Sequence, residues 1–193
     1  MIIILLFLNF DSNSFILFFV KEHIMEKLDI SKFKSPEDIP IGTILVQHWC
    51  NSSTFFKVIG TSKKSVLIIK MPSKQTRFEH EGGGTGYSYK VPDEETLQNV
   101  EAAYKACNKK YGFDVLKGTR DQFDEAKRIA EANKENFWDD YVIVSNYREC
   151  LTPKRIMVKP SSTGGFYIPG YYKGSWCGPL KLWNGEEVSD YYN

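Results

Sequence analysis

The chain has 193 residues, of which 42% are hydrophobic and 15% aromatic, so it is long enough for one domain with a packed core. Its formal net charge of +1 excludes the dense positive charge of a dedicated nucleic-acid-binding protein. Residues 42–81 carry six basic and two acidic side chains, whereas residues 91–140 carry eight basic and twelve acidic ones. The segments that resemble strands are therefore basic, and the helical middle of the chain is acidic.

We interpret residues 1–24 as a translated leader outside the working protein. Their two apolar runs lack the positive start and the small-residue end of a signal peptide. In a membrane helix Asp11 would lie near the midplane, at a cost of about 2.5–3.5 kcal/mol. Lys21-Glu22 can be encoded by a bacterial ribosome-binding sequence, which predicts that Met25 is the natural start. A membrane anchor and an apolar helix packed on the domain are the alternatives.

Residues 25–40 form a polar lead-in to a single domain that spans residues 41–193. Ser35-Pro36 has the chemistry of a one-turn helix start, since serine caps and proline opens a helix. Runs of apolar and β-branched residues separated by short polar turns then predict an antiparallel meander. Residues 66–69 are apolar on both faces, which indicates a strand covered on both sides. The strands expected here are 43–49, 54–60 and 65–71.

The glycine-rich segment 82–86 resembles a phosphate-binding loop only superficially. Its glycines do not follow the Gly-x-Gly-x-x-Gly spacing, and no Gly-Lys-Ser/Thr follows them. We interpret the segment as the tip of a mobile hairpin.

Apolar residues at helical spacing predict helices at 94–111 and 120–137. Gly112 ends the first helix, and Thr119 with Gln122 forms a capping-box start for the second. The β-branched run that follows predicts a return to strand at 141–147, and another strand is expected at 154–159. The helices thus form a helical hairpin, residues 92–140, inserted between strands. The predicted fold class is α+β, a small antiparallel SH3-like β-barrel with an inserted helical hairpin.

The cysteines are widely spaced and include no Cys-x-x-Cys pair. We expect reduced and mostly buried thiols rather than a disulfide framework. A zinc site built from His48, Cys50 and a distant cysteine is a weaker alternative, because structural zinc sites usually bring paired ligands. We predict no metal and no cofactor. The cysteines are Cys50, Cys107, Cys150 and Cys177.

Two aromatic motifs carry a family resemblance that covers roughly residues 41–71 and 154–193. The first is Gly42-Thr43-Ile44 with Trp49 and Phe55-Phe56-Lys57-Val58. The second is Ser175-Trp176-Cys177 with Leu182-Trp183-Asn184-Gly185 and Tyr191. Together they resemble a family of small proteins from bacteriophages and other mobile elements. In that family Phe-Tyr is common at Phe55-Phe56, tyrosine at Trp176 and aspartate at Asn184. The resemblance implies a small barrel and a mobile-element origin, and it implies no reaction.

The sequence predicts no catalytic residue and favours a non-enzymatic protein. His48 lies on an apolar strand, where a core or rim histidine is the usual interpretation, and the carboxylates lie on helix surfaces. Exposed aromatic groups with nearby cations suit protein hot spots and single-stranded nucleic acid equally well. We expect Trp49 and Trp183 in the barrel core, because a small barrel needs large side chains to fill it. The predicted partner-binding residues are Tyr171, Tyr172, Lys173, Trp176, Lys63 and Lys64.

The leading hypothesis is a phage-type binding protein that acts stoichiometrically on a host or phage macromolecule in the host cytoplasm. A host-defence inhibitor, of which anti-CRISPR proteins are one class, is the specific case. A protein is the first partner expected, nucleic acid is the second, and no membrane is involved. The alternative function is a nucleic-acid-binding accessory or regulatory protein. The sequence indicates no oligomeric state.

Overall fold

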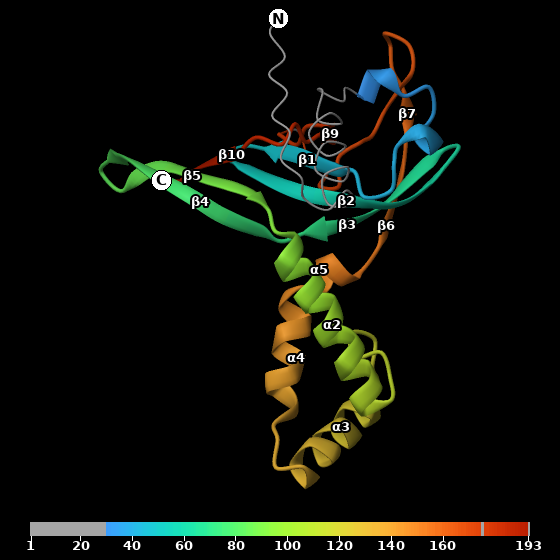
Figure 1. Cartoon of the computed structure of the whole chain (residues 1–193), viewed down its shortest axis with the longest axis vertical. Helices are drawn as coiled ribbons and strands as arrows, with labels where there is room; N and C mark the ends of the chain where they lie inside the picture. Colours follow the sequence, from blue (N-terminus) through green and yellow to red (C-terminus); the bar gives the residue numbers. More distant parts are fainter. Residues whose placement is uncertain (1–29, 175, 193) are drawn as a thin grey trace, which may run out of the picture.

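The computed structural model describes residues 30–174 and 176–192, which form three antiparallel sheets and a helical unit (Figure 1). The predicted leader lies outside these residues. The larger sheet has the strand order β6-β3-β2-β1-β9. Its members are β1 (Ile44–Trp49), β2 (Ser52–Ser62), β3 (Ser65–Met71), β6 (Lys154–Met157) and β9 (Lys181–Leu182). None of the helices in the described ranges is both long enough and apolar enough to span a membrane.

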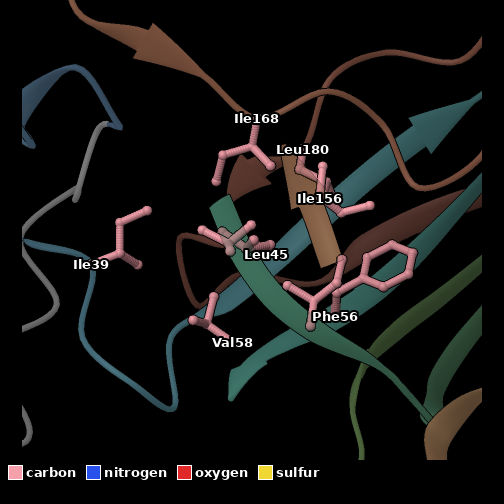
Figure 2. Close-up of a cluster of buried hydrophobic side chains, with 9 residues drawn as sticks. Ile39, Leu45, Phe56, Val58, Ile156, Ile168 and Leu180 are labelled. Atoms are coloured by element: carbon pink, nitrogen blue, oxygen red, sulfur yellow. The ribbon is translucent and has the colours of Figure 1, made fainter. Parts of the chain in front are cut away.

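The core of the larger sheet lies on both of its faces. One face packs against Ile39, which precedes β1, and against Ile168 and Leu180, which bridge each other (Figure 2). We call this cluster the main core. The other face carries Phe55 and Met71 and packs against Leu97 and Cys150 at the base of the helical unit. Strand β3 contributes side chains to both cores: Val66 and Ile68 lie in the first, and Ile69 and Met71 lie in the second. The prediction of a strand covered on both sides is therefore confirmed.

A second, three-stranded sheet has the order β10-β5-β4, and the sequence did not predict it. It is built from β4 (Ser73–Gly82), β5 (Thr85–Pro92) and β10 (Val188–Tyr192). The glycine run forms the turn between β4 and β5, as the sequence predicted. All residues of β4 are exposed, so this strand has none of the apolar alternation by which strands are recognised. In Figure 1 the β4–β5 hairpin projects sideways from the rest of the molecule.

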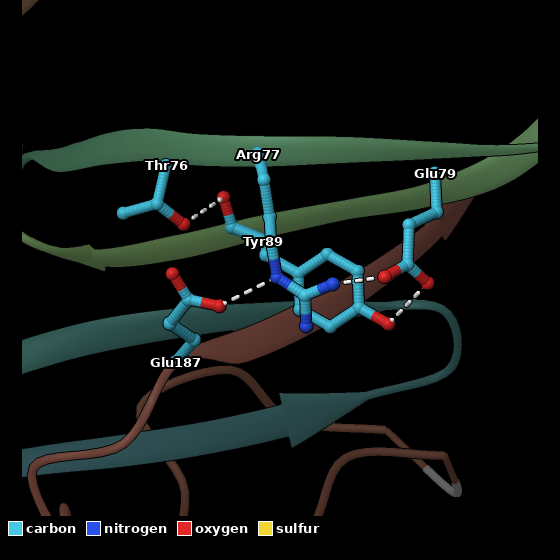
Figure 3. Close-up of polar contacts among 5 residues, drawn as sticks. All are labelled: Thr76, Arg77, Glu79, Tyr89 and Glu187. Carbon is cyan, nitrogen blue, oxygen red and sulfur yellow. Dashed lines mark hydrogen bonds and ion pairs between the residues drawn. The ribbon is translucent and has the colours of Figure 1, made fainter.

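A cation–π contact, an ion pair and hydrogen bonds stabilise this projecting hairpin (Figure 3). The guanidinium group of Arg77 lies 3.4 Å from the centre of the Tyr89 ring, and its Nε donates to Glu187 Oε2 at 2.8 Å. Arg77 also pairs with Glu79, which accepts a hydrogen bond from the Tyr89 hydroxyl at 2.9 Å. Glu187 precedes β10, so the network ties the end of the chain to the hairpin.

The described strands do not close into the predicted barrel. The larger sheet is open, with β6 and β9 at its edges, and both edge strands are short. The last strand, β10, pairs with β5 instead of extending this sheet. An α+β fold of antiparallel sheets is thus confirmed, whereas closure of the barrel is not seen.

The helical unit is larger than the predicted hairpin. It contains α2 (Glu94–Tyr111), α3 (Arg120–Ala132), α4 (Phe137–Asn146) and α5 (Arg148–Leu151). Helix α2 has its predicted bounds, and Gly112 ends it with a left-handed φ of 78°. Thr119 and Gln122 form the predicted capping box of α3, which ends five residues earlier than expected. The unit has a hydrophobic core of its own and extends away from the sheets in Figure 1.

The strand predicted at 141–147 is wrong, because residues 141–146 belong to helix α4 and Tyr147 caps its end. The side chain of Asn136 accepts from the Trp138 amide and caps the helix, and Asp139 and Asp140 occupy its first turn. Phe137 and Val144 are buried in the helical core, at helical spacing. This packing and the cap outweigh the β propensity of a β-branched run, as tertiary context commonly does.

Two short two-residue strands, β7 (Lys159–Pro160) and β8 (Phe166–Tyr167), pair with each other after β6. Short 3-10 helices η1 (Ile30–Lys32) and η2 (Pro36–Asp38) lie before β1. Ser35 caps η2 as predicted, with its hydroxyl accepting from the Glu37 amide.

Candidate interaction surface

The predicted site residues fall into two separate places in the structure. Lys63 and Lys64 form the exposed turn that precedes β3, whereas Lys70 near the other end of β3 lies 5.8 Å from the ring centre of Tyr172. The length of β3 therefore separates the lysine turn from the tyrosines. One place is the lysine turn, Lys63 and Lys64. The other is an aromatic face, which we define as Trp49, Tyr171, Tyr172 and Trp176.

The aromatic face is held by a buried glutamine. Gln47 is fully buried on β1, and its Nε2 donates to the carbonyl oxygens of Tyr172 at 3.0 Å and Gly178 at 2.8 Å. Its Oε1 accepts from the Tyr172 amide at 3.0 Å. A Cβ atom on Gly170 would lie 2.0 Å from Gln47 Nε2, so only glycine lets the backbone pass this closely. One side chain thus fixes a segment 125 residues away in the sequence.

The two tyrosines are not the free surface that the sequence predicted. Both are half-buried and pack against the main core. The Tyr171 ring stacks on Phe56 with centroids 4.8 Å apart, and Lys154 Nζ lies 3.7 Å from the same ring centre. Burial also raises the pKa of Tyr171. The prediction failed because the glycines beside the pair allow close packing on Gln47 rather than presentation to solvent.

The two tryptophans provide the exposed part of the aromatic face. Trp176 is 77% exposed and Trp49 is 40% exposed. The Cys50 amide donates to the Trp176 carbonyl at 3.3 Å, and the Gly178 amide donates to the His48 carbonyl at 3.0 Å. Trp176 therefore projects from a backbone that is fastened to the end of β1. Its predicted exposure is confirmed, whereas the prediction that Trp49 lies in the core is wrong.

Trp183, the other expected core residue, is half-buried at the edge of the core that Phe55 and Met71 share with the helical unit. Its ring meets Phe55 edge-on at 5.9 Å, and its Nε1 donates to the Glu186 carbonyl at 2.7 Å. Lys173, predicted as a contact residue, is exposed in the segment between Tyr172 and Trp176.

Charged groups border the tyrosine side of the aromatic face. Lys70 Nζ pairs with Glu149 Oε2 at 2.8 Å, and the Tyr172 hydroxyl donates to the same oxygen at 3.4 Å. Burial lowers the pKa of Lys70, but its contacts with Glu149 and Tyr172 outweigh burial and raise it overall. The hydrogen bond from Lys70 lowers the pKa of Glu149. Both groups are charged at neutral pH, and their charges offset each other.

A second set of polar residues joins β10 to the β1–β2 hairpin. His48 Nδ1 lies 2.8 Å from the Ser53 hydroxyl, and Asp190 Oδ1 accepts from the Ser53 amide at 2.7 Å. Ser53 is only 4% exposed, and Asp190 bonds to its backbone and to Lys90 rather than to the histidine. A nucleophilic serine needs an accessible hydroxyl and a base oriented by a third group. This geometry is that of a structural junction, beside an open cavity of about 380 Å³ that His48 and Trp183 help to line.

The junction makes stability depend on pH. The side chain of His48 is partly exposed. Burial of the rest of the ring and the nearby charge of Lys181 lower its pKa from 6.5. The folded protein then binds the proton less readily than the unfolded chain, so the free energy of unfolding falls as the pH drops below about 6.5. Above that pH His48 is neutral in both states, so it does not change the free energy of unfolding with pH. Urea denaturation between about pH 5 and 7.5 should show this decline, and the His48→Gln variant should show a flatter one. An identical slope in both proteins would contradict the assignment.

Two of the four cysteines are buried. Burial raises the pKa of the Cys107 and Cys150 thiols, each to about 11, whereas Cys50 is exposed and Cys177 half-exposed. All four are free, as expected, and fewer are buried than expected. Within residues 30–174 and 176–192, no three His, Cys, Asp or Glu side chains are grouped so that they could hold a metal ion.

Comparison with protein-family models, with curated proteins and with solved structures gave no match to this chain. The resemblance to mobile-element proteins therefore stays a prediction from the two aromatic motifs.

Proposed function

We propose that this chain is a non-catalytic binding protein that occupies a macromolecular partner stoichiometrically through its aromatic face. The observation that carries the proposal is Trp176, a 77% exposed tryptophan on a backbone fastened to β1. Tryptophan is among the residues that contribute most to binding at protein interfaces. A side chain on a fixed backbone loses little conformational freedom on binding, which favours affinity.

A protein partner agrees with the geometry better than single-stranded nucleic acid does. Stacking of bases needs open aromatic rings flanked by free cations. Phe56 and Lys154 already occupy the ring of Tyr171, and Lys70 is paired with Glu149. The tryptophans remain open, and they suit a hydrophobic anchor on a protein surface. The resemblance to mobile-element proteins supports a partner in the host cell, and a component of a host defence system is the specific case of this proposal.

The test is recovery of a partner from a bacterial host that expresses the tagged chain. We expect one host protein to be retained in near-stoichiometric amount, and to be lost when Trp49→Ala and Trp176→Ala are combined. Trp138→Ala is the matched control, because Trp138 is 48% exposed but lies on α4 of the helical unit. Equal retention by the wild type and the double variant would contradict a role for the aromatic face.

Nucleic acid is the alternative outcome, and it has a distinct signature. Binding to single-stranded DNA or RNA should weaken steeply as salt is raised, because bound counterions are released. A salt titration with labelled oligonucleotides separates the two functions. Tight, salt-sensitive binding that depends on Trp49 and Trp176 would replace the protein partner by nucleic acid.

A further inference from the structure

A groove separate from the aromatic face lies where the lysine turn meets the segment after β6. It has a volume of about 400 Å³ and is walled by four stretches of chain: 34–36, 63–64, 157–160 and 165–166. The Val158 amide donates to the Lys64 carbonyl at 3.0 Å, and β7 pairs with β8. Backbone hydrogen bonds therefore join three of the four stretches, namely 63–64, 157–160 and 165–166, so these walls of the groove are fixed by the fold.

The charged side chains that line this groove all have one sign. Four lysines line it, and no acidic residue does. None of the four makes an ion pair with another residue in the described ranges, whereas Lys57, Lys70 and Lys110 elsewhere are all paired with carboxylates. Glu37 and Asp38 follow Pro36 outside this lining, and the Asp38 carboxylate accepts from the Ser35 amide at 2.8 Å. The lysines of the groove are Lys34, Lys63, Lys64 and Lys159.

The floor of the groove is apolar. Met157 is 55% exposed, and Val158 and Phe166 are half-buried against the main core. Pro36 and Pro160 also line the groove. Because Phe166 packs inward, the groove offers little open aromatic surface for a base to stack on. A flexible thioether beside aliphatic and proline surfaces instead suits an apolar side chain of a peptide.

From this combination we infer that the groove binds an acidic segment of a protein partner, with an apolar side chain over Met157 and carboxylates on the lysine rim. The inference rests on the proposed function, since it names the kind of surface that the partner presents. Charge complementarity of this type speeds association and disfavours wrong partners, and it weakens as salt screens the charges. The groove and the aromatic face are separate, so each can be disabled alone.

Fluorescence anisotropy of a short labelled peptide of Glu and Asp with two internal Leu residues tests the inference. We expect Lys63→Glu combined with Lys64→Glu to weaken binding of this peptide by about tenfold or more, because like charges then face each other. Met157→Ser should weaken it by a smaller factor, and so should replacing the peptide's leucines with serine. Lys105→Glu combined with Lys109→Glu is the matched control, since both lysines are exposed on α2 and should leave affinity unchanged.

Three results would overturn the inference: no binding of the peptide, equal loss in the control variant, or tighter binding of a single-stranded oligonucleotide of equal charge. Because Lys63 and Lys64 lie outside the aromatic face, failure of the groove and failure of the proposed function give different results. If the peptide does not bind while the variant at Trp49 and Trp176 still loses the host partner, the inference about the groove is rejected and the proposed role of the aromatic face is retained. The reverse pattern would retain the groove and reject the aromatic face.

Discussion

Replacing Gln47 with leucine is expected to lower the free energy of unfolding by about 3 kcal/mol or more. The leucine fills a similar space but leaves three half-buried backbone groups without their partner, namely the Tyr172 amide and the carbonyls of Tyr172 and Gly178. Each unsatisfied buried group costs about 1–3 kcal/mol. Urea denaturation of the variant beside the wild type measures the effect.

The control for this substitution is Gln98→Leu, which makes the same chemical change at an exposed position of α2. It should leave stability within about 0.5 kcal/mol of the wild type. If Gln47→Leu were as stable as Gln98→Leu, Gln47 would not be the anchor of the aromatic face.

Replacing Phe56 with alanine is expected to cost about 3–5 kcal/mol, the range for deletion of a buried phenylalanine. Phe56 is fully buried in the main core (Figure 2). Its ring also stacks on that of Tyr171. A loss of this size is a large fraction of the stability of a small domain. Thermal melting monitored by circular dichroism should show a much lower midpoint or no cooperative transition.

Phe78→Ala is the matched control for the core substitution. Phe78 is 36% exposed on the projecting hairpin, where it contacts Tyr192 and His80. Its loss should shift the midpoint far less. Similar shifts for Phe56→Ala and Phe78→Ala would mean that the main core is not where the structure places it.

Local chemistry explains which elements the sequence predicted. The bounds of α2 follow from Asp93, which caps it, and Gly112, which ends it. Turns of polar residues on either side likewise define β1 and β3 within a residue of their predicted ends. These signals lie within a few residues of the element that they determine, so a single sequence is enough to find them.

The elements that were missed depend on contacts between distant residues. Helix α4 contains a run of β-branched residues, which favour strands. It is helical because Phe137 and Val144 pack in the core of the helical unit. Strand β4 has no apolar face, and β5 and β10 pair across about half the chain. No local pattern of hydrophobicity encodes such pairing.

The same distinction applies to the interaction surface. Exposure of the Lys63-Lys64 turn was predictable, because a tight turn between two strands lies at the surface. Burial of Tyr171 and Tyr172 was not, because it depends on Gln47 from another strand. A glutamine inside an otherwise apolar strand was the available signal, since a buried amide needs hydrogen-bond partners.

The dissociation constant of the purified host partner tests most directly whether this chain acts through its exposed tryptophans. Calorimetric titration should give a stoichiometry of one partner per chain. The combined Trp49→Ala and Trp176→Ala variant should bind more weakly by about 2 kcal/mol or more and melt at nearly the wild-type temperature, whereas Trp138→Ala should match the wild type in both. Unchanged affinity in the double variant, or a loss of affinity that is accompanied by unfolding, would contradict the account.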